Sequence, residues 1–201
     1  MHNPAKSEYP VHALIQNRWS PRALSEKPIS RETLRSLFEA ARWAPSSKNE
    51  QPWAFIVATK DQPEEFARIL STLVEFNQSW AKRAALIGIA VSEMEFACNQ
   101  HPNRNAFYDT GAAMSQLTTE ATARELFVHQ MAGFDPYKAI EVLHIPKGWE
   151  PIVTFTVGYA GDPNSLPEPL REHELAARSR KPIAEFVMSG KWGQQAHFLT
   201  K

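Results

Sequence analysis

The chain has 201 residues, of which 43% are hydrophobic and 22% are charged. This size and composition are typical of one soluble globular domain with a sizeable core. The 22 basic and 22 acidic side chains give a formal net charge of zero. That balance argues against a general nucleic-acid or membrane surface, which would need a basic excess. A local cluster of arginines could still bind one phosphate.

No apolar run approaches the roughly 20 residues needed to span a bilayer, and residues 1–8 lack the apolar core of a signal peptide. Cys98 is the only cysteine, so an intrachain disulfide is excluded and a reducing cytoplasm is the expected location. Cys98 and His101 have the spacing of two zinc ligands, but no second pair lies nearby. We therefore expect no metal site and place both residues in a surface loop.

Residues 1–9 are expected to be disordered, and residues 11–18 to form a short helix. Pro21 disfavours the helical conformation at Ser20, so the next segment should be extended. In an extended segment Arg18, Ser20 and Arg22 point to the same side. Two guanidiniums that flank a hydroxyl suit an anion. From these residues alone, a solvated basic turn is the alternative.

A helix should begin after Ser30, a good N-cap, and carry an apolar stripe to Ala41. Pro45 disfavours the helical conformation of the residue before it, and a loop of hydroxyl and amide side chains follows at residues 45–51. The apolar run 53–58 does not alternate, which predicts a strand buried on both faces. Such a loop can hold backbone donors beside a flat polar ligand, although an ordinary connection is the alternative.

In the middle of the chain, the sequence pattern predicts a helix over residues 62–74, a second buried strand over 86–91 and a long irregular loop over 93–105. Loops of this length are often lids or binding loops. The longest helix is expected over residues 106–124. Gly111 lies near its centre at a cost of about 1 kcal/mol relative to alanine. We therefore expect another part of the core, or another subunit, to pack closely there.

The last third predicts a strand over residues 126–128, a turn containing Gly133, a helix over 136–143 and a strand over 151–159. A proline-rich polar tail follows, without a predicted helix. We find no internal repeat and no domain boundary. The whole chain, residues 1–201, is therefore interpreted as a single domain.

Residues 41–53, Ala-Arg-Trp-Ala-Pro-Ser-Ser-Lys-Asn-Glu-Gln-Pro-Trp, resemble the signature of the nitroreductase family. Members of that family are FMN-dependent oxidoreductases that form intertwined homodimers. Residues 105–111 resemble the start of the family's central dimer helix, and residues 131–135 resemble its Gly-Phe-Asp turn. Matching segments follow one another in the right order from Leu14 to Trp192, so the resemblance covers most of the chain.

The resemblance implies an α+β fold of three layers, in which helices flank a central mixed, mostly antiparallel sheet. It also implies an intertwined homodimer with the active site at the subunit interface. Residues 184–201 would then form a C-terminal segment that packs on the partner subunit.

The resemblance further implies where FMN binds. Arg18, Ser20, Arg178 and Arg180 would hold the phosphate, through charge-assisted hydrogen bonds of about 1.5–3 kcal/mol each. Arg22 would lie beside the N1–C2=O edge and stabilise the negative charge of the reduced flavin. Backbone N–H groups of the Gly133 turn would face N5, and the 45–49 loop would reach the flavin of the other subunit. The expected cofactor-binding set is Arg18, Trp19, Ser20, Arg22, Pro45, Ser46, Ser47, Asn49, Asn77, Met131, Ala132, Gly133, Arg178 and Arg180.

The implied reaction takes hydride from NAD(P)H and reduces a nitroaromatic, quinone-like or other small organic acceptor by a ping-pong mechanism. Flavin carries this chemistry, so no catalytic acid or base is assigned. His129 is a candidate proton donor, with a structural role as the alternative.

Trp19, Pro21 and residues 129–131 depart from the family pattern. A flavin-dependent dehalogenase, a flavin-consuming enzyme and a non-catalytic FMN-binding protein stay as alternatives, whereas the absence of Gly-x-Gly-x-x-Gly argues against common nucleotide-binding folds.

Overall fold

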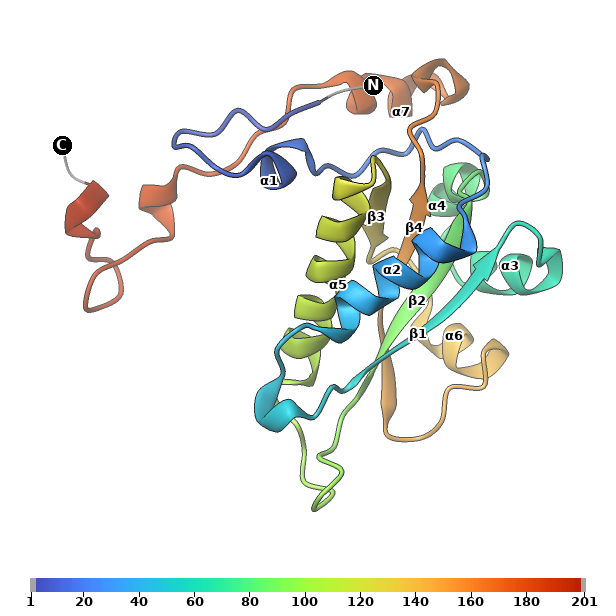
Figure 1. Ribbon diagram of the computed structural model, residues 1–201, viewed down its shortest axis with the longest axis horizontal. Helices are drawn as coiled ribbons and strands as arrows, with labels where there is room; N and C mark the ends of the chain where they lie inside the picture. Colours follow the sequence, from blue (N-terminus) through green and yellow to red (C-terminus); the bar gives the residue numbers. More distant parts are fainter. Residues whose placement is uncertain (1–2, 200–201) are drawn as a thin grey trace.

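The computed structural model describes residues 3–199 and contains one four-stranded sheet (Figure 1). The strand order is β1-β2-β4-β3, and each pairing is antiparallel. The predicted sheet was mixed and mostly antiparallel; only the antiparallel part is present between residues 3 and 199. The strands are β1 (Trp53–Thr59), β2 (Leu86–Glu93), β3 (Phe127–Met131) and β4 (Trp149–Gly158).

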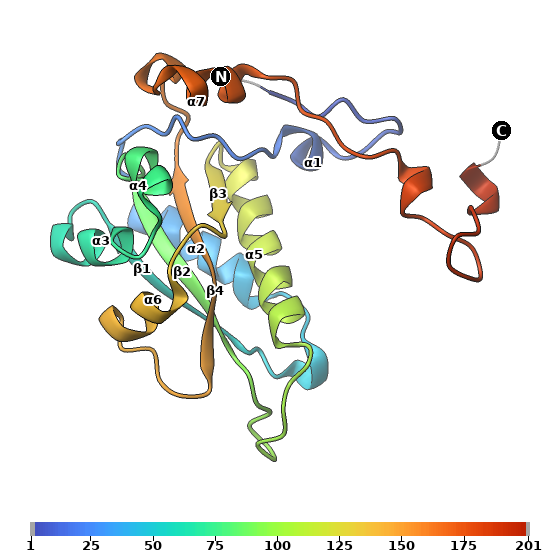
Figure 2. The same ribbon diagram turned by 180° about the vertical axis from the view of Figure 1, so that it is seen from behind.

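Helices cover both faces of this sheet, which confirms the expected three-layer α+β architecture (Figures 1 and 2). α2 and α5 lie on one face, while α3, α4 and α6 lie on the other. The helices are α1 (Ala13–Asn17), α2 (Arg31–Arg42), α3 (Pro63–Leu70), α4 (Glu75–Ala81), α5 (Ala106–Ala123), α6 (Pro136–Val142) and α7 (Glu168–Leu175), with short 3-10 turns at Ser47–Asn49, Pro163–Ser165, Ile183–Glu185 and His197–Leu199.

The central strand β2 shows why both faces are covered. Successive side chains of a strand point to opposite faces. Leu86 and Ala90 join the core under α2 and α5, whereas Ile87 and Ile89 face the helices of the other layer. β1 differs from its prediction, because only Ala58 is fully buried. β1 is an edge strand with one neighbour, so its apolar run is only half-covered within this chain.

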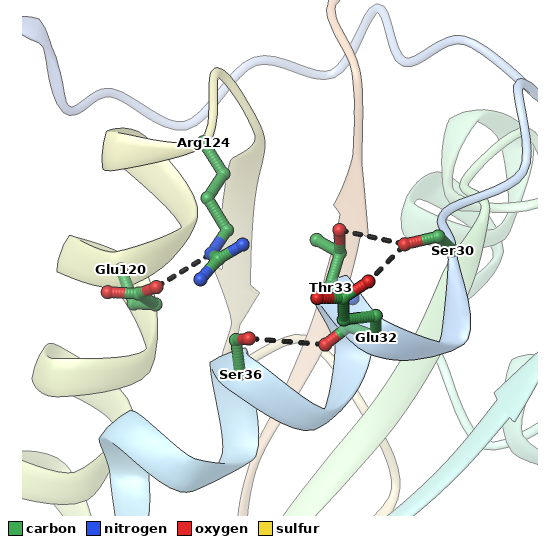
Figure 3. A network of polar contacts seen from close by, with 6 residues as sticks. All are labelled: Ser30, Glu32, Thr33, Ser36, Glu120 and Arg124. Carbon is green, nitrogen blue, oxygen red and sulfur yellow. Dashed lines mark hydrogen bonds and ion pairs between the residues drawn. The ribbon is translucent and has the colours of Figure 1, made fainter.

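α2 begins as its sequence predicts (Figure 3). The Oγ of Ser30 accepts a hydrogen bond from the backbone N–H of Thr33 at 3.1 Å, which satisfies one free donor of the first turn. α2 packs against α5, whose last turn carries an ion pair between Glu120 and Arg124 at 2.6 Å. This packing brings the loop that follows α2 beside the first turn of α5.

Two helices and several boundaries differ from the predictions; β3 continues to Met131 rather than ending at residue 128, and α1 begins at Ala13 rather than at residue 11. α4 and α7 were not predicted, and α3 ends at Leu70 rather than near residue 74. Neither α4 nor α7 has a side-chain N-cap, and both are shorter than nine residues, so their local signals are weak. The buried side chains of Trp80 in α4 and Leu170 in α7 place these helices through tertiary packing.

The N-terminal segment runs beside the stretch that follows α7, where the Nδ2 of Asn3 donates to the backbone carbonyl of Ala176 at 3.2 Å (Figure 1). The guanidinium of Arg178 donates to the backbone carbonyls of Asn3 at 3.0 Å and Gln16 at 3.2 Å. The predictions of disorder for residues 1–9 and of a partner-bound segment for residues 184–201 extend into residues 1–2 and 200–201, which lie outside the described residues; both stay predictions. Among residues 3–199, no helix is long and apolar enough to cross a membrane.

Candidate functional site

Three arginines from the two ends of the chain converge on one place. The Nη1 of Arg18 donates to the Oγ of Ser20 at 3.1 Å. Burial, together with the charges of Arg178 and Arg180, lowers the pKa of Arg18. Burial and the charge of Arg180 likewise lower the pKa of Arg178. No carboxylate between residues 3 and 199 forms an ion pair with these three guanidiniums, so the cluster is a strong attractor for an anion.

Arg18 and Arg180 line a cavity of about 440 Å³ between β3 and the open face of α5. Gly111 contributes to this face, and a Cβ added to it would meet no atom within 4 Å. The close packing expected at Gly111 is therefore not supplied by the described chain. The cavity is lined by Leu14, Ile15, Arg18, Ser20, Gly111, Ser115, Thr118, Thr119, Val128, Gln130 and Arg180.

Arg22 presents a buried donor without an acceptor. Its Nε has no hydrogen-bond partner among the described residues. The backbone around it is nevertheless held firmly, because the N–H groups of Arg22 and Ala23 donate to the carboxylate of Glu174 at 3.0 and 2.9 Å. A buried donor of this kind is costly unless a ligand supplies the acceptor.

His129 supports the same segment from another side. Its Nδ1 lies 3.0 Å from the carbonyl oxygen of Pro21, and its ring centroid lies 4.5 Å from that of Trp80. Burial lowers the pKa of His129 to about 4; the hydrogen bond to Pro21 opposes this shift, and the charge of Arg22 adds to it. The imidazole is thus neutral at pH 7, and these contacts favour the structural role over proton donation.

The turn after β3 is tied to α4. The Nδ2 of Asn77 and the backbone N–H of Val74 both donate to the carbonyl oxygen of Gly133, at 3.0 and 3.1 Å. A Cβ on Gly133 would lie 2.6 Å from the Nδ2 of Asn77, so a larger residue here would displace the Asn77 amide from its hydrogen bond. The N–H of Gly133 makes no hydrogen bond to the described residues and is free for a ligand.

The loop of residues 45–51 lies elsewhere in the same subunit. The N–H of Ser47 donates to Asp109 in the first turn of α5 at 2.9 Å, and Ser46 accepts from the N–H of Gln51 at 3.0 Å. Lys48, Asn49 and Gln51 have positive φ angles of 53°, 58° and 52°, so the loop is tightly turned. α1 and the segment after it pass the other end of α5 (Figure 1). Pro45, Ser46, Ser47 and Asn49 are therefore not brought to the arginine cluster of their own chain.

Other predicted site residues take part through the backbone at most. Trp19 is 6% exposed and packs edge-to-face on Phe127, with ring centroids 5.9 Å apart. The side chain of Met131 belongs to the core beneath α3 and α4, while Ala132 is exposed beside the Gly133 turn. Cys98 is an exposed thiol, and no group of three metal-ligating side chains occurs within residues 3–199.

A sequence model of the nitroreductase family matches residues 15–159. The chain belongs to the nitroreductase family. The family match ends before Glu174, Arg178 and Arg180, so the C-terminal half of the arginine cluster is placed by the structure of this chain and not by that match.

Several known proteins are similar to this nitroreductase-family chain, one of them in structure and two in sequence. A crystal structure described as an oxidoreductase containing FMN has a TM-score of 0.89 and 34% identity, covering 94% of this chain and 96% of its own. A Streptomyces coelicolor protein named "putative NADH dehydrogenase/NAD(P)H nitroreductase" is 24% identical over 81% of this chain and 91% of its own. A 5,6-dimethylbenzimidazole synthase of Rhodospirillum rubrum is 26% identical over 86% of this chain and 90% of its own.

Sequence reasoning missed several residues of the site. Thr118, Thr119 and Gln130 line the cavity, and Glu174 holds the backbone at Arg22. The residues of α5 that face the cavity lie three to four positions apart, a spacing visible in the sequence. Glu174 gave no signal, because its partners lie about 150 residues earlier in the chain, as their separations of 151 and 152 show.

Proposed function

We propose that this nitroreductase-family chain binds FMN, takes hydride from NAD(P)H and reduces a small organic acceptor by a ping-pong mechanism. The observation that carries the proposal is the cluster of Arg18, Arg178 and Arg180, which has no carboxylate counterion within residues 3–199 and borders a cavity. The FMN-containing structure at 34% identity and the relative named as an NAD(P)H nitroreductase support the choice of cofactor and reductant.

The phosphate would bind where the cations meet. Arg18 and Arg180 face the cavity with Ser20, whose hydroxyl can donate to a phosphate oxygen. The Nη1 of Arg178 donates to the carbonyl oxygens of Asn3 and Gln16. Arg178 would therefore add positive charge at the phosphate end, and its hydrogen bonds also hold the N-terminal segment in place. An anion would relieve the mutual repulsion of the three guanidiniums, which favours phosphate retention.

The ring would lie between Arg22 and the Gly133 turn. The buried Nε of Arg22 and the free N–H of Gly133 are two donors that lack acceptors among the described residues, and a flavin edge offers acceptors. Bound FMN would supply the hydride and electron transfer itself. The part of Arg22 is to hold a fixed positive charge where negative charge develops during reduction.

We further propose that the active unit is a homodimer with its site at the subunit interface. On the open face of α5, Tyr108 is 81% exposed to solvent and Phe107 is 49% exposed, and in the C-terminal segment Trp192 is 92% exposed. A second subunit covering this face would also bring its 45–49 loop to the arginine cluster. The proposed acceptors are nitroaromatic or quinone-like compounds, and the proposed location is the cytoplasm.

The decisive experiment is an absorbance spectrum of purified protein before and after anaerobic addition of NADH or NADPH. Protein that contains FMN should be yellow and should bleach on addition of the nicotinamide. A nitroaromatic or quinone added next should restore the colour. Colourless protein that ignores added FMN would contradict the proposal. Size-exclusion chromatography with light scattering should give the mass of two chains.

A second candidate function follows from the dimethylbenzimidazole synthase relative. In a flavin-consuming enzyme, FMN would be the substrate and would disappear from the solution during turnover. Incubating the protein with reduced FMN and oxygen, followed by chromatography of the products, separates the two functions. Recovery of intact flavin after many turnovers supports the oxidoreductase, and formation of dimethylbenzimidazole supports the alternative.

A further inference from the structure

The carboxylate of Glu174 is buried, with 2% exposure, and lies in the last turn of α7. Its two oxygens accept the backbone N–H groups of Arg22 at 3.0 Å and Ala23 at 2.9 Å. The partners of the carboxylate are thus backbone N–H groups and not a basic side chain. Hydrogen bonds to an ionised acceptor are about twice as strong as neutral ones.

The position of Glu174 links the two ends of the proposed flavin site. Four residues after Glu174 the chain reaches Arg178, and two residues later Arg180, both at the phosphate end. On the other side of the carboxylate lies Arg22, the cation proposed for the ring end. One buried side chain therefore connects the segment that carries the C-terminal arginines with the backbone that carries Arg22.

The backbone near Arg22 is also held by neighbours that do not depend on Glu174. The N–H of Gly161 donates to the carbonyl oxygen of Ala23 at 2.7 Å, and His129 contacts Pro21 at 3.0 Å. Loss of the carboxylate should therefore loosen the N–H groups of Arg22 and Ala23 without unfolding the segment. The orientation of the Arg22 side chain is the property most directly affected.

We infer that Glu174 is a positioning residue: its carboxylate fixes the backbone of Arg22 so that the guanidinium is aimed at the flavin ring. This inference rests on the proposed function. The carboxamide of Glu174→Gln has one acceptor oxygen and places an NH2 group against the backbone donors. Arg22 should then be less well aimed, although it is chemically unchanged.

The midpoint potential of bound FMN tests this inference, because its sign separates two explanations. A fixed cation favours the negatively charged reduced flavin, so misplacing Arg22 should make the potential more negative. Mere removal of a negative charge would make it more positive. We expect both Glu174→Gln and Arg22→Ala to shift the potential in the negative direction. Glu172→Gln is the matched control, since Glu172 is exposed on the same helix.

Riboflavin binding provides a second readout, because riboflavin lacks the phosphate and reports on the ring end. Quenching of flavin fluorescence should show about tenfold weaker riboflavin binding for Glu174→Gln, the size expected for one charge-assisted hydrogen bond. In the Arg22→Ala background Glu174→Gln should no longer make the potential more negative and should not weaken riboflavin binding further. Two residues that act through one another are non-additive.

A positive shift of the potential for Glu174→Gln alone, an equally large negative shift in the Arg22→Ala background, or behaviour equal to Glu172→Gln would overturn the inference. Should Glu174→Gln fail to fold, Glu174→Asp carries the test, because it keeps the charge and shortens its reach by one methylene. That variant should show a smaller shift of the same sign, and an unchanged potential would count against the inference. Wild-type protein that binds neither FMN nor riboflavin would instead overturn the proposed function, and this inference with it.

Discussion

The Nδ2 of Asn77 in α4 donates to the carbonyl oxygen of Gly133 at 3.0 Å, across a separation of 56 residues. A helix that precedes β2 thus fixes the turn that follows β3. The backbone N–H of Val74 donates to the same oxygen at 3.1 Å. Two donors thus hold the peptide unit that joins Gly133 to Phe134, and the N–H of Gly133, which belongs to the preceding peptide unit, bonds to no described residue.

Gly133→Ala should weaken both the fold and flavin binding. The new Cβ would lie 2.6 Å from the Nδ2 of Asn77 and 3.1 Å from the Cγ2 of Val74. Displacing the Asn77 amide breaks its hydrogen bond, and overpacking of this kind costs about 1–3 kcal/mol. Urea unfolding of the apoprotein measures the loss. Adding Asn77→Ala should recover part of the packing cost, and a double variant no more stable than the sum of the singles would contradict the stated clash.

The arginines should divide between two tasks. Arg18→Ala and Arg180→Ala remove charge at the proposed phosphate end, and each should weaken FMN binding by about tenfold or more while sparing riboflavin. Arg22→Ala should weaken both flavins alike and should slow anaerobic reduction by NADH or NADPH at saturating FMN. Fluorescence titration and stopped-flow absorbance measure these effects. Identical patterns for all three variants would refute this division.

Gly111→Ala tests whether the open face of α5 is covered by a partner. Within one chain the new methyl meets nothing within 4 Å, and alanine is favoured over glycine in a helix by about 1 kcal/mol. An isolated subunit should therefore become more stable. A closely packed dimer should instead dissociate more readily, which sedimentation at a series of concentrations would detect. A variant that gains stability without any change in dimer dissociation would show that the partner does not touch Gly111.

His129 should make the fold sensitive to acid. Burial holds its pKa at about 4, whereas an unfolded chain has the ordinary value of 6.5. Between these values the unfolded state binds more protons, so stability falls as the pH drops from 6.5 towards 4, by at most about 3 kcal/mol. Above pH 6.5 this residue should have no effect on the pH dependence of stability.

The comparison for that prediction is His129→Asn, which retains a donor near Pro21 but does not titrate in this range. Urea unfolding midpoints at pH 5 and pH 7 should differ less for this variant than for the wild type. The exposed His101 provides the control, because His101→Asn should leave the difference between the two pH values unchanged. Equal acid sensitivity of all three proteins would show that other groups dominate.

Local signals in the sequence were sufficient for the parts of the fold that depend on neighbouring residues. Ser30 marks the start of α2, Pro63 occupies the first turn of α3, and the apolar run of β2 identifies the central strand. α4 and α7 were not predicted, because tertiary packing and not side-chain capping determines where they form. The edge position of β1 also depends on strand order, which no local pattern contains.

The candidate site divides in the same way. Arg18 and Ser20 were placed on one side by the extended segment before Pro21, and their hydrogen bond agrees with this. The meeting of Arg18 with Arg178 and Arg180 came only from the resemblance to the nitroreductase family, and the structure brings these residues together. Glu174 was not found by either route, since its partners are backbone groups far away in the sequence.

α5 has 18 residues and is about 27 Å long, and it separates the Ser47 loop from the segment that carries Arg18. In the proposed dimer, neither polypeptide could assemble a whole site by itself. A substitution in the Ser47 loop and a substitution at Arg18 would then impair different halves of the site, and each could be compensated by the other subunit. Two inactive variants, one altered at Arg18 and the other at Ser47, should regain activity when their subunits are exchanged, because each mixed pair would hold one undamaged site.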